Sequence, residues 1–272
     1  MKIGTFLLHL EQIQQRYQLG SLEAVLASPY VQGIQCVDGD TKVYDRMDLP
    51  EVKNLLDDRG IETSSIYHVA VCDEITGAGR EKLMDDLKYQ LDRCAFMETG
   101  ILMPVPGCSA EIALTDRPKL MLEYFAAAAE LAQPYGIKAA AENYSRRESR
   151  FTSVAEVGYY LDQLPQLGYV LDTGNFWFTG ADVMEACDKY LDKVVHVHMK
   201  DIKEMTAEPV RMLEGRGFDS TAIGEGDLPL KKIVERLKTV GYEGALSIEI
   251  SSPLRLGEKM EESIRNIKSW IQ

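Results

Sequence analysis

The sequence is poor in the features that bind nucleic acids or membranes. It has 30 Lys and Arg against 43 Asp and Glu, a formal net charge of −13, and this excess of negative charge would repel a phosphate backbone. No apolar run approaches the roughly 18 residues of a membrane span, and the apolar run at the start is too short for a signal peptide. We therefore expect a soluble, cytoplasmic protein that binds neither nucleic acid nor membranes.

Cysteine patterns and nucleotide-binding motifs are also missing. The five cysteines are scattered without a Cys-x-x-Cys pair, which argues against a thiol-based zinc or redox site. Neither a G-x-G-x-x-G fingerprint nor a P-loop occurs, so nothing supports an open dinucleotide-binding sheet. We expect reduced thiols without a catalytic role.

A regular alternation of short apolar runs and longer segments of helical period is present instead. The apolar runs are 2–8, 33–38, 61–69, 100–106, 137–143, 168–172, 194–200 and 245–250. Eight strand-and-helix units favour closure into a (β/α)8 TIM barrel, an α/β fold for which 272 residues is an ordinary single-domain length. We therefore expect one domain over residues 1–272, with a long, poorly structured loop from about 202 to 226 after the seventh strand.

Two of the expected helices carry start or stop signals. Ser153 followed by Glu156 has the pattern of a capping box. Asp227 precedes Pro229 and an apolar helical pattern, and Gly241 follows that pattern. We expect Asp227 to cap the helix and Gly241 to end it.

Ionisable residues stand at the C-terminal ends of four expected strands: Glu142, Asp172, His198 and Glu249. In a TIM barrel these ends converge on the mouth, where a buried charge is costly unless it is paired or binds a metal. Three carboxylates and one imidazole suit Mn²⁺, Mg²⁺ or Co²⁺, with Zn²⁺ a further candidate. The pattern predicts a site for one divalent metal ion, and a buried ion-pair network is the plainer alternative.

The same residues lie in segments that resemble the xylose isomerase-like TIM barrel superfamily of sugar and sugar phosphate isomerases and epimerases, which includes ketose 3-epimerases. The segments read AENY, LDTGN, HVHMKD, IGEGDLPL and LSIEI, and the similarity is strongest from Gly136 to Ile250. The resemblance implies that the four residues bind one metal ion, and that Glu142 and Glu249 also exchange protons with opposite faces of the substrate. It further implies a homodimer or homotetramer, since such barrels often assemble.

More than one reaction on a small sugar or polyol-derived ketone is compatible with these residue types. Removal of a proton next to a carbonyl gives an enediolate, and its reprotonation completes an isomerisation or epimerisation. This is the activity that we predict first. Loss of a β-hydroxyl instead would make the protein a dehydratase of the inosose or 3-dehydroshikimate kind. A non-catalytic sugar-binding barrel is a third alternative, which the intact set of four residues disfavours.

Three residues on the third and seventh expected strands are candidates for supporting roles. His68 ends the third strand and would either contact substrate or form a hydrogen bond within the rim. Lys200 lies two residues beyond His198 on the same strand face, so it would bind a substrate oxygen or form a salt bridge. His196 is expected to be a hydrogen-bonded core histidine rather than a ligand.

Three residues in loops are further candidates for substrate binding. Asn175 stands where many members of the superfamily have histidine, and its amide can bind a sugar hydroxyl. Trp177 would form an apolar wall beside the sugar, or pack internally. Arg211 would meet a substrate phosphate, or lie on the solvated surface.

Overall fold

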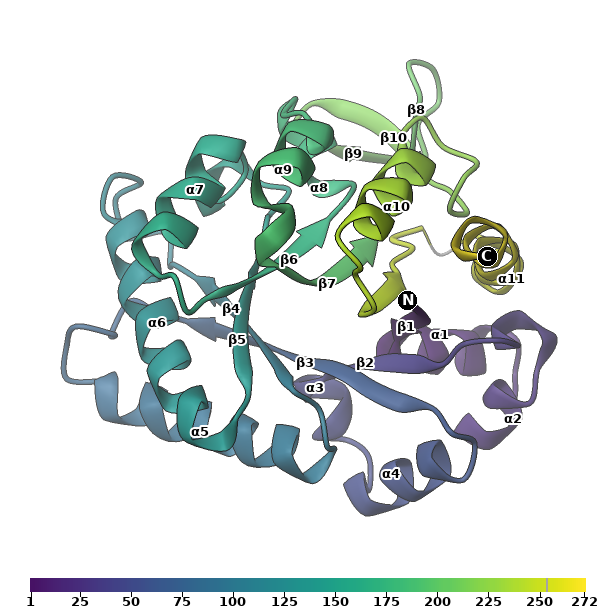
Figure 1. The fold of residues 1–272 in the computed structure, drawn as a ribbon, viewed down its shortest axis with the longest axis horizontal. Coiled ribbons are helices and arrows are strands. Elements are labelled where there is room, and N and C mark those ends of the chain that lie inside the picture. The colour runs from purple at the N-terminus through teal and green to yellow at the C-terminus, as the bar shows by residue number, and fades with distance from the viewer. Residues whose placement is uncertain (253) are drawn as a thin grey trace.

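The computed structural model, which describes residues 1–252 and 254–272, contains a closed barrel of eight parallel strands (Figure 1). The barrel strands are β1 (Lys2–Phe6), β2 (Cys36–Asp40), β3 (Glu62–Val71), β4 (Ile101–Gly107), β5 (Lys138–Glu142), β6 (Gly168–Asp172), β7 (Val194–Met199) and β11 (Ala245–Ile248). Their order around the barrel is β1-β11-β7-β6-β5-β4-β3-β2. Each of the eight expected positions holds one strand, so the predicted TIM barrel is confirmed.

Helices follow the strands and cover the outside of the barrel (Figure 1). The α-helices are α1 (Leu7–Arg16), α2 (Leu22–Leu26), α3 (Thr41–Tyr44), α4 (Leu49–Asp57), α5 (Arg80–Phe96), α6 (Arg117–Ala132), α7 (Val154–Gln163), α8 (Asn175–Thr179), α9 (Val183–Tyr190), α10 (Leu230–Thr239) and α11 (Leu256–Ile271). Short 3-10 turns lie at Pro29–Val31, Gln133–Tyr135, Arg147–Ser149 and Leu191–Lys193. No helix in the described part of the chain has the length and apolar character needed to cross a membrane.

The segment after β7 differs from the expectation of a poorly structured loop. It forms a small antiparallel sheet of β8 (Ile202–Glu204), β9 (Arg211–Leu213) and β10 (Arg216–Ser220), in the order β8-β10-β9. Strands of three to five residues are too short to show a periodic pattern, and they are stabilised by pairing with their neighbours. Phe218 of β10 packs on Phe178 of α8, with ring centroids 4.8 Å apart, and so joins this sheet to the barrel.

The predicted start and stop signals of the helices have mixed outcomes. Ser153 Oγ accepts a hydrogen bond from the Glu156 N–H at 3.2 Å, as expected for the start of α7. Gly241 follows α10 with a left-handed φ of 68°, which suits a helix stop. The cap prediction for Asp227 is wrong, because its carboxylate accepts from the Glu204 N–H and the Lys203 ammonium instead. Both donors belong to β8, so the carboxylate stabilises this strand instead of the start of α10.

The inward faces of the strands are packed below the mouth of the barrel. Met103, Ala140 and Val170 form a small buried cluster on β4, β5 and β6. Because side chains alternate along a strand, Ala140 shares its face with Glu142, and Val170 shares its face with Asp172. The main core is a larger cluster of buried aliphatic and aromatic residues that spans the strands and the surrounding helices. The packed interior therefore supports the ionisable residues at the strand ends.

Candidate metal centre and active site

The structure brings the four predicted metal ligands together at one side of the barrel mouth. One ligand atom from each of Glu142, Asp172, His198 and Glu249 lies within 4.8 Å of the others. Their strands are consecutive in the barrel, in the order β11-β7-β6-β5. Asp172 and His198 are buried, whereas the two glutamates are partly exposed. We refer to these four residues as the quartet.

The imidazole of His198 lies among carboxylates. Its Nδ1 atom is 2.6 Å from Glu142 Oε1 and 3.8 Å from Glu249 Oε2. Burial by itself lowers the pKa of His198, but the carboxylates of Glu142, Asp38 and Glu249 outweigh burial and raise that pKa to about 9. The negative potential that favours a proton on this ring would equally favour a metal cation.

Lys200 is the cation that the structure places beside the quartet. Its Nζ atom is 2.9 Å from Asp172 Oδ2, 2.8 Å from Glu249 Oε1 and 2.9 Å from Asn175 Oδ1. Burial lowers the pKa of this ammonium, but Asp172 and Glu249 outweigh burial and raise it above its usual value. The lysine reaches this position because Gly174 has no side chain. A Cβ atom there would lie 2.7–2.9 Å from the carbons of the Lys200 side chain.

Asp172 is held in place by backbone and amide groups. Its Oδ1 atom accepts hydrogen bonds from the N–H groups of Gly174 and Asn175 at 2.8 and 2.7 Å. Asn143 binds the Asp172 main chain on both sides, accepting from the N–H and donating to the carbonyl, each at 3.0 Å. Burial raises the pKa of Asp172, with Lys200 opposing the shift. The carboxylate is thus fixed in orientation, with Oδ2 turned to the other members of the quartet.

The donor set of the quartet fits a divalent cation. Apart from the ion pair with Lys200, Asp172 Oδ2 has no hydrogen-bond partner among residues 1–252 and 254–272. Buried carboxylate oxygens are normally paired, and a metal ion is one of the partners that satisfies them. Three carboxylates and an imidazole are ligands that Mn²⁺, Mg²⁺, Co²⁺ and Zn²⁺ accept. The arrangement is therefore compatible with the metal site predicted from the sequence.

A cavity of about 450 Å³ opens above the quartet. Glu142, His198 and Glu249 line it, together with Asn175 and Lys200. The opposite wall is largely apolar and comes from β1, the start of α1, β3 and β4: Phe6, Leu8, Val69, Met103 and Val105. The cavity has the size and mixed lining of a site for a small polar molecule.

The other three substrate-binding candidates lie outside this cavity. His68 Nε2 is 2.7 Å from Asp86 Oδ2 of α5, on the outer face of β3. Trp177 stacks under the Arg216 guanidinium, whose carbon is 3.5 Å from the ring centroid. Arg211 donates to the Ser251 carbonyl from the small sheet. The structure thus agrees with the second role considered for each of them: a hydrogen bond within the protein for His68, internal packing for Trp177 and a surface position for Arg211. Tyr67 takes the inward position next to His68, because successive residues of a strand face opposite ways.

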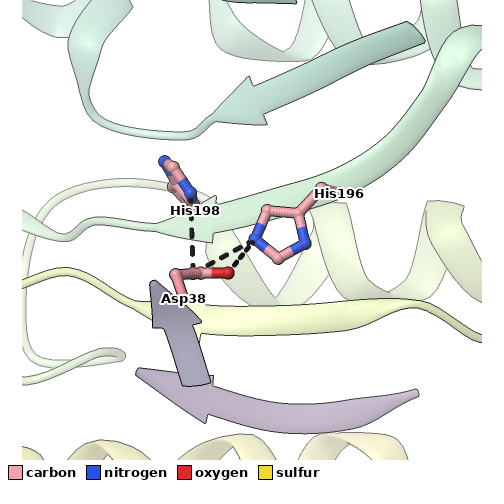
Figure 2. A group of neighbouring side chains, drawn as sticks. All are labelled: Asp38, His196 and His198. Carbon is pink, nitrogen blue, oxygen red and sulfur yellow. Dashed lines mark hydrogen bonds and ion pairs between the residues drawn. The ribbon is translucent and has the colours of Figure 1, made fainter. Parts of the chain in front are cut away.

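Asp38 is a residue of this region that the sequence analysis missed. It is buried on β2, and its Oδ1 atom is 3.0 Å from Nε2 of His196 (Figure 2). His196 is therefore a hydrogen-bonded core histidine, as predicted. Burial alone would raise the pKa of Asp38, but His196 and His198 outweigh it and hold that pKa well below its usual range. A carboxylate inside an apolar run was the available signal, the same one that marked the quartet.

Comparisons with known proteins agree with this fold. Residues 27–270 match the family model described as xylose isomerase-like TIM barrel. An inosose isomerase from Halalkalibacterium halodurans is 22% identical over 223 residues, which cover 81% of this chain and 77% of that protein. An inosose dehydratase from Clostridium perfringens is 33% identical over 106 residues, but the aligned part is only 36% of either chain. The crystal structure of the IolI protein with a bound zinc atom aligns over 100% of this chain and 98% of its own, with a TM-score of 0.72 at 17% identity.

Proposed function

The chain belongs to the xylose isomerase-like TIM barrel family, and on this premise we propose that it is a metal-dependent enzyme acting on a cyclic, polyol-derived ketone of the inosose class. The reaction would begin with removal of a proton from the carbon next to the carbonyl. The observation that carries the proposal is the quartet, with its two glutamates lining a cavity of about 450 Å³. The relatives named as inosose isomerase and inosose dehydratase support a polyol-derived ketone over a sugar as the substrate.

Glu142, Asp172, His198 and Glu249 would hold one divalent ion. The zinc atom of the structurally similar IolI protein supports an ion of this type. When bound, such an ion polarises the ketone oxygen and so acidifies the neighbouring C–H bond.

The two glutamates would carry the proton transfers. One carboxylate takes the proton from the α-carbon, and the electron pair of the broken C–H bond forms the double bond of an enediolate. In a dehydration the carbonyl reforms, and the electron pair of the enediolate double bond moves to the bond between the α- and β-carbons and expels the β-hydroxyl, which leaves as water after taking a proton from a carboxyl group. In an isomerisation the former carbonyl carbon takes the proton instead, and the proton of the neighbouring hydroxyl passes to the former carbonyl oxygen, so that the carbonyl moves by one carbon. Both outcomes leave the enzyme in its starting protonation state once solvent exchange is complete.

Lys200 and Asn175 would orient the substrate beside these carboxylates. Both line the cavity, and the Lys200 ammonium lies 2.8 Å from Glu249 Oε1. The ammonium also offers a donor to a ring hydroxyl or to developing negative charge on oxygen. The apolar wall opposite limits the water that reaches the enediolate.

Sugar epimerisation is the second candidate, and the positions of the glutamates favour it. Glu142 ends β5 and Glu249 directly follows β11, and the strands of Asp172 and His198 lie between these two strands in the barrel. Such an arrangement suits proton removal on one face of a substrate and proton delivery on the other.

Hydrogen–deuterium exchange followed by NMR tests the proposed function. Metal-stripped protein in D₂O is given Mn²⁺, Mg²⁺, Co²⁺ or Zn²⁺ and a panel of inososes, 3-dehydroshikimate, and free and phosphorylated ketoses. We expect metal-dependent deuterium incorporation beside the carbonyl of an inosose, and the product then separates dehydration from isomerisation. Inversion at a carbon of a ketose would favour the epimerase. Absence of exchange in the whole panel would refute proton transfer as the activity.

A further inference from the structure

Beneath the quartet, a buried carboxylate faces two imidazoles of the same strand. Figure 2 shows Asp38, the middle residue of β2, with His196 and His198 of β7 both interacting with its carboxylate. The side chains of all three residues are at most 1% exposed. Bulk solvent therefore does not reach these polar groups, which makes their contacts with one another important.

The two oxygens of Asp38 have different surroundings. Oδ1 accepts hydrogen bonds from the hydroxyls of Ser64 and Ser65, each at 2.7 Å, and lies 3.0 Å from His196 Nε2. Oδ2 lies 3.2 Å from the same His196 nitrogen and 3.7 Å from His198 Nε2. The first oxygen is saturated, while the second keeps a lone pair for a donor on the side of His198.

The two nitrogens of His198 also differ. Nδ1 faces the carboxylates of Glu142 and Glu249, on the side of the cavity. Nε2 faces Asp38 and has no hydrogen-bond partner in the described part of the chain. A histidine that gives one nitrogen to a metal carries its proton on the other, and a carboxylate that accepts this proton fixes the ring and its tautomer.

We propose that Asp38 is a positioning residue of the metal centre, which accepts the Nε2–H of His198 and thereby directs the Nδ1 lone pair toward the ion. The inference rests on the proposed function, because it presupposes that the quartet binds a metal. Ser64, Ser65 and His196 hold the carboxylate in place. The 3.7 Å between His198 Nε2 and Asp38 Oδ2 is longer than a hydrogen bond. A small rotation of the imidazole toward Asp38 would bring the two atoms within hydrogen-bond distance.

The first test compares metal affinity in two isosteric variants. Asp38→Asn presents an amide to His198. The control is Asp40→Asn on the same strand, whose carboxylate accepts hydrogen bonds from the Tyr67 hydroxyl and the Lys42 N–H rather than from His196 or His198. Calorimetric titration of the metal-free proteins with Mn²⁺ and Zn²⁺ should show an affinity loss of roughly 10- to 100-fold for Asp38→Asn. Asp40→Asn should bind the ions as the unchanged protein does. Equal affinity of the Asp38→Asn and unchanged proteins would overturn the inference.

The second test reads the tautomer directly and needs no variant. In the zinc-loaded protein with ¹⁵N-labelled histidine, long-range ¹H–¹⁵N spectra should show His198 with a protonated Nε2 and a metal-bound Nδ1. The opposite tautomer would overturn the role of Asp38 even if Asp38→Asn does not fold. Failure of the unchanged protein to bind either ion refutes the metal centre, and with it both the proposed function and this inference. Tight binding with the wrong tautomer refutes only the inference.

Discussion

The two halves of the barrel present different surfaces at the mouth. The half formed by β5, β6, β7 and β11 ends in ionisable residues that contact one another: Glu142, Asp172, His198, Lys200 and Glu249. The half formed by β1 to β4 contributes a mainly apolar wall to the same cavity: Phe6, Leu8, Val69, Met103 and Val105. The contrast indicates that one half supplies the chemistry and the other mainly supplies the shape. Changes in the first half should therefore affect turnover, and changes in the second should affect substrate affinity.

The largest effect is expected from Glu249→Gln in the ionisable half. Loss of one acid–base group should lower turnover by about 10²–10⁴-fold, while an amide oxygen still remains as a weaker metal ligand. Deuterium exchange rates and calorimetric metal titration of the same protein measure the two effects separately. Glu243→Gln, an exposed glutamate just before β11, serves as the control. Full activity of Glu249→Gln would remove the assignment of this residue to proton transfer.

Lys200→Met should lower the stability of the metal-free protein, because the ammonium of Lys200 neutralises part of the negative charge of the quartet. Removing one partner of a buried ion pair costs about 3–5 kcal/mol of stability, because carboxylates are left without their counter-charge. A bound divalent ion would replace part of that charge, so the loss should be smaller in the loaded protein. Urea denaturation with and without chelator measures this difference. Lys203→Met removes an exposed pair with Asp227 and should cost at most about 1 kcal/mol. The same loss in both metal states would argue against an ion near Lys200.

The apolar half contains a buried histidine, His9, that should make the stability of the protein depend on pH. Burial lowers the pKa of His9, on α1, from 6.5 to about 4. Between these pH values His9 is protonated in the unfolded chain but neutral in the folded protein. The free energy of unfolding therefore falls as the pH falls from about 6.5 to 4. The slope from this group is at most about 1.4 kcal/mol per pH unit.

His9→Gln should remove that contribution. Denaturation of the variant and the unchanged protein at pH 7, 6 and 5 gives the comparison, and the stability difference should shift in favour of the variant as the pH falls. A difference that stays constant with pH would contradict a neutral, buried His9.

The smallest effect is expected at the apolar wall. Val69 lines the cavity from β3 and is 48% exposed, so Val69→Ala should raise KM by roughly threefold to tenfold with little change in kcat. Steady-state kinetics on the substrate identified by the exchange experiment measures both constants. Val71→Ala, on the same strand and outside the cavity lining, is the matched control. A fall in kcat alone would show that this half also takes part in the chemistry.

The quartet was accessible from the sequence because of a property of the fold. Parallel strands of a closed barrel all end at one rim, so a charged residue at each of four strand ends must approach the others. Asp38 lies in the middle of β2, two residues before Asp40 at the strand end, so the rule for strand ends does not single it out. Its partners His196 and His198 are 158 and 160 residues further along the chain. Only the closed barrel shows that these side chains meet.

Some features were decided by tertiary structure alone. Strands of a parallel barrel are buried on both faces, so hydrophobic alternation does not reveal whether His68 or Tyr67 points inward. The small sheet after β7 depends on strand pairing and on the contact between Phe218 and Phe178.

The sequence by itself determined the eight strand-and-helix units, the closed barrel and the positions of the four ionisable strand ends, because each depends on local periodicity and on the geometry common to this fold. The tertiary structure decided which residues face the cavity and which buried charges Lys200 and Asp38 contact. It also decided that the segment after β7 forms a small sheet. These depend on contacts between segments far apart in the chain, whose energies local sequence patterns do not contain.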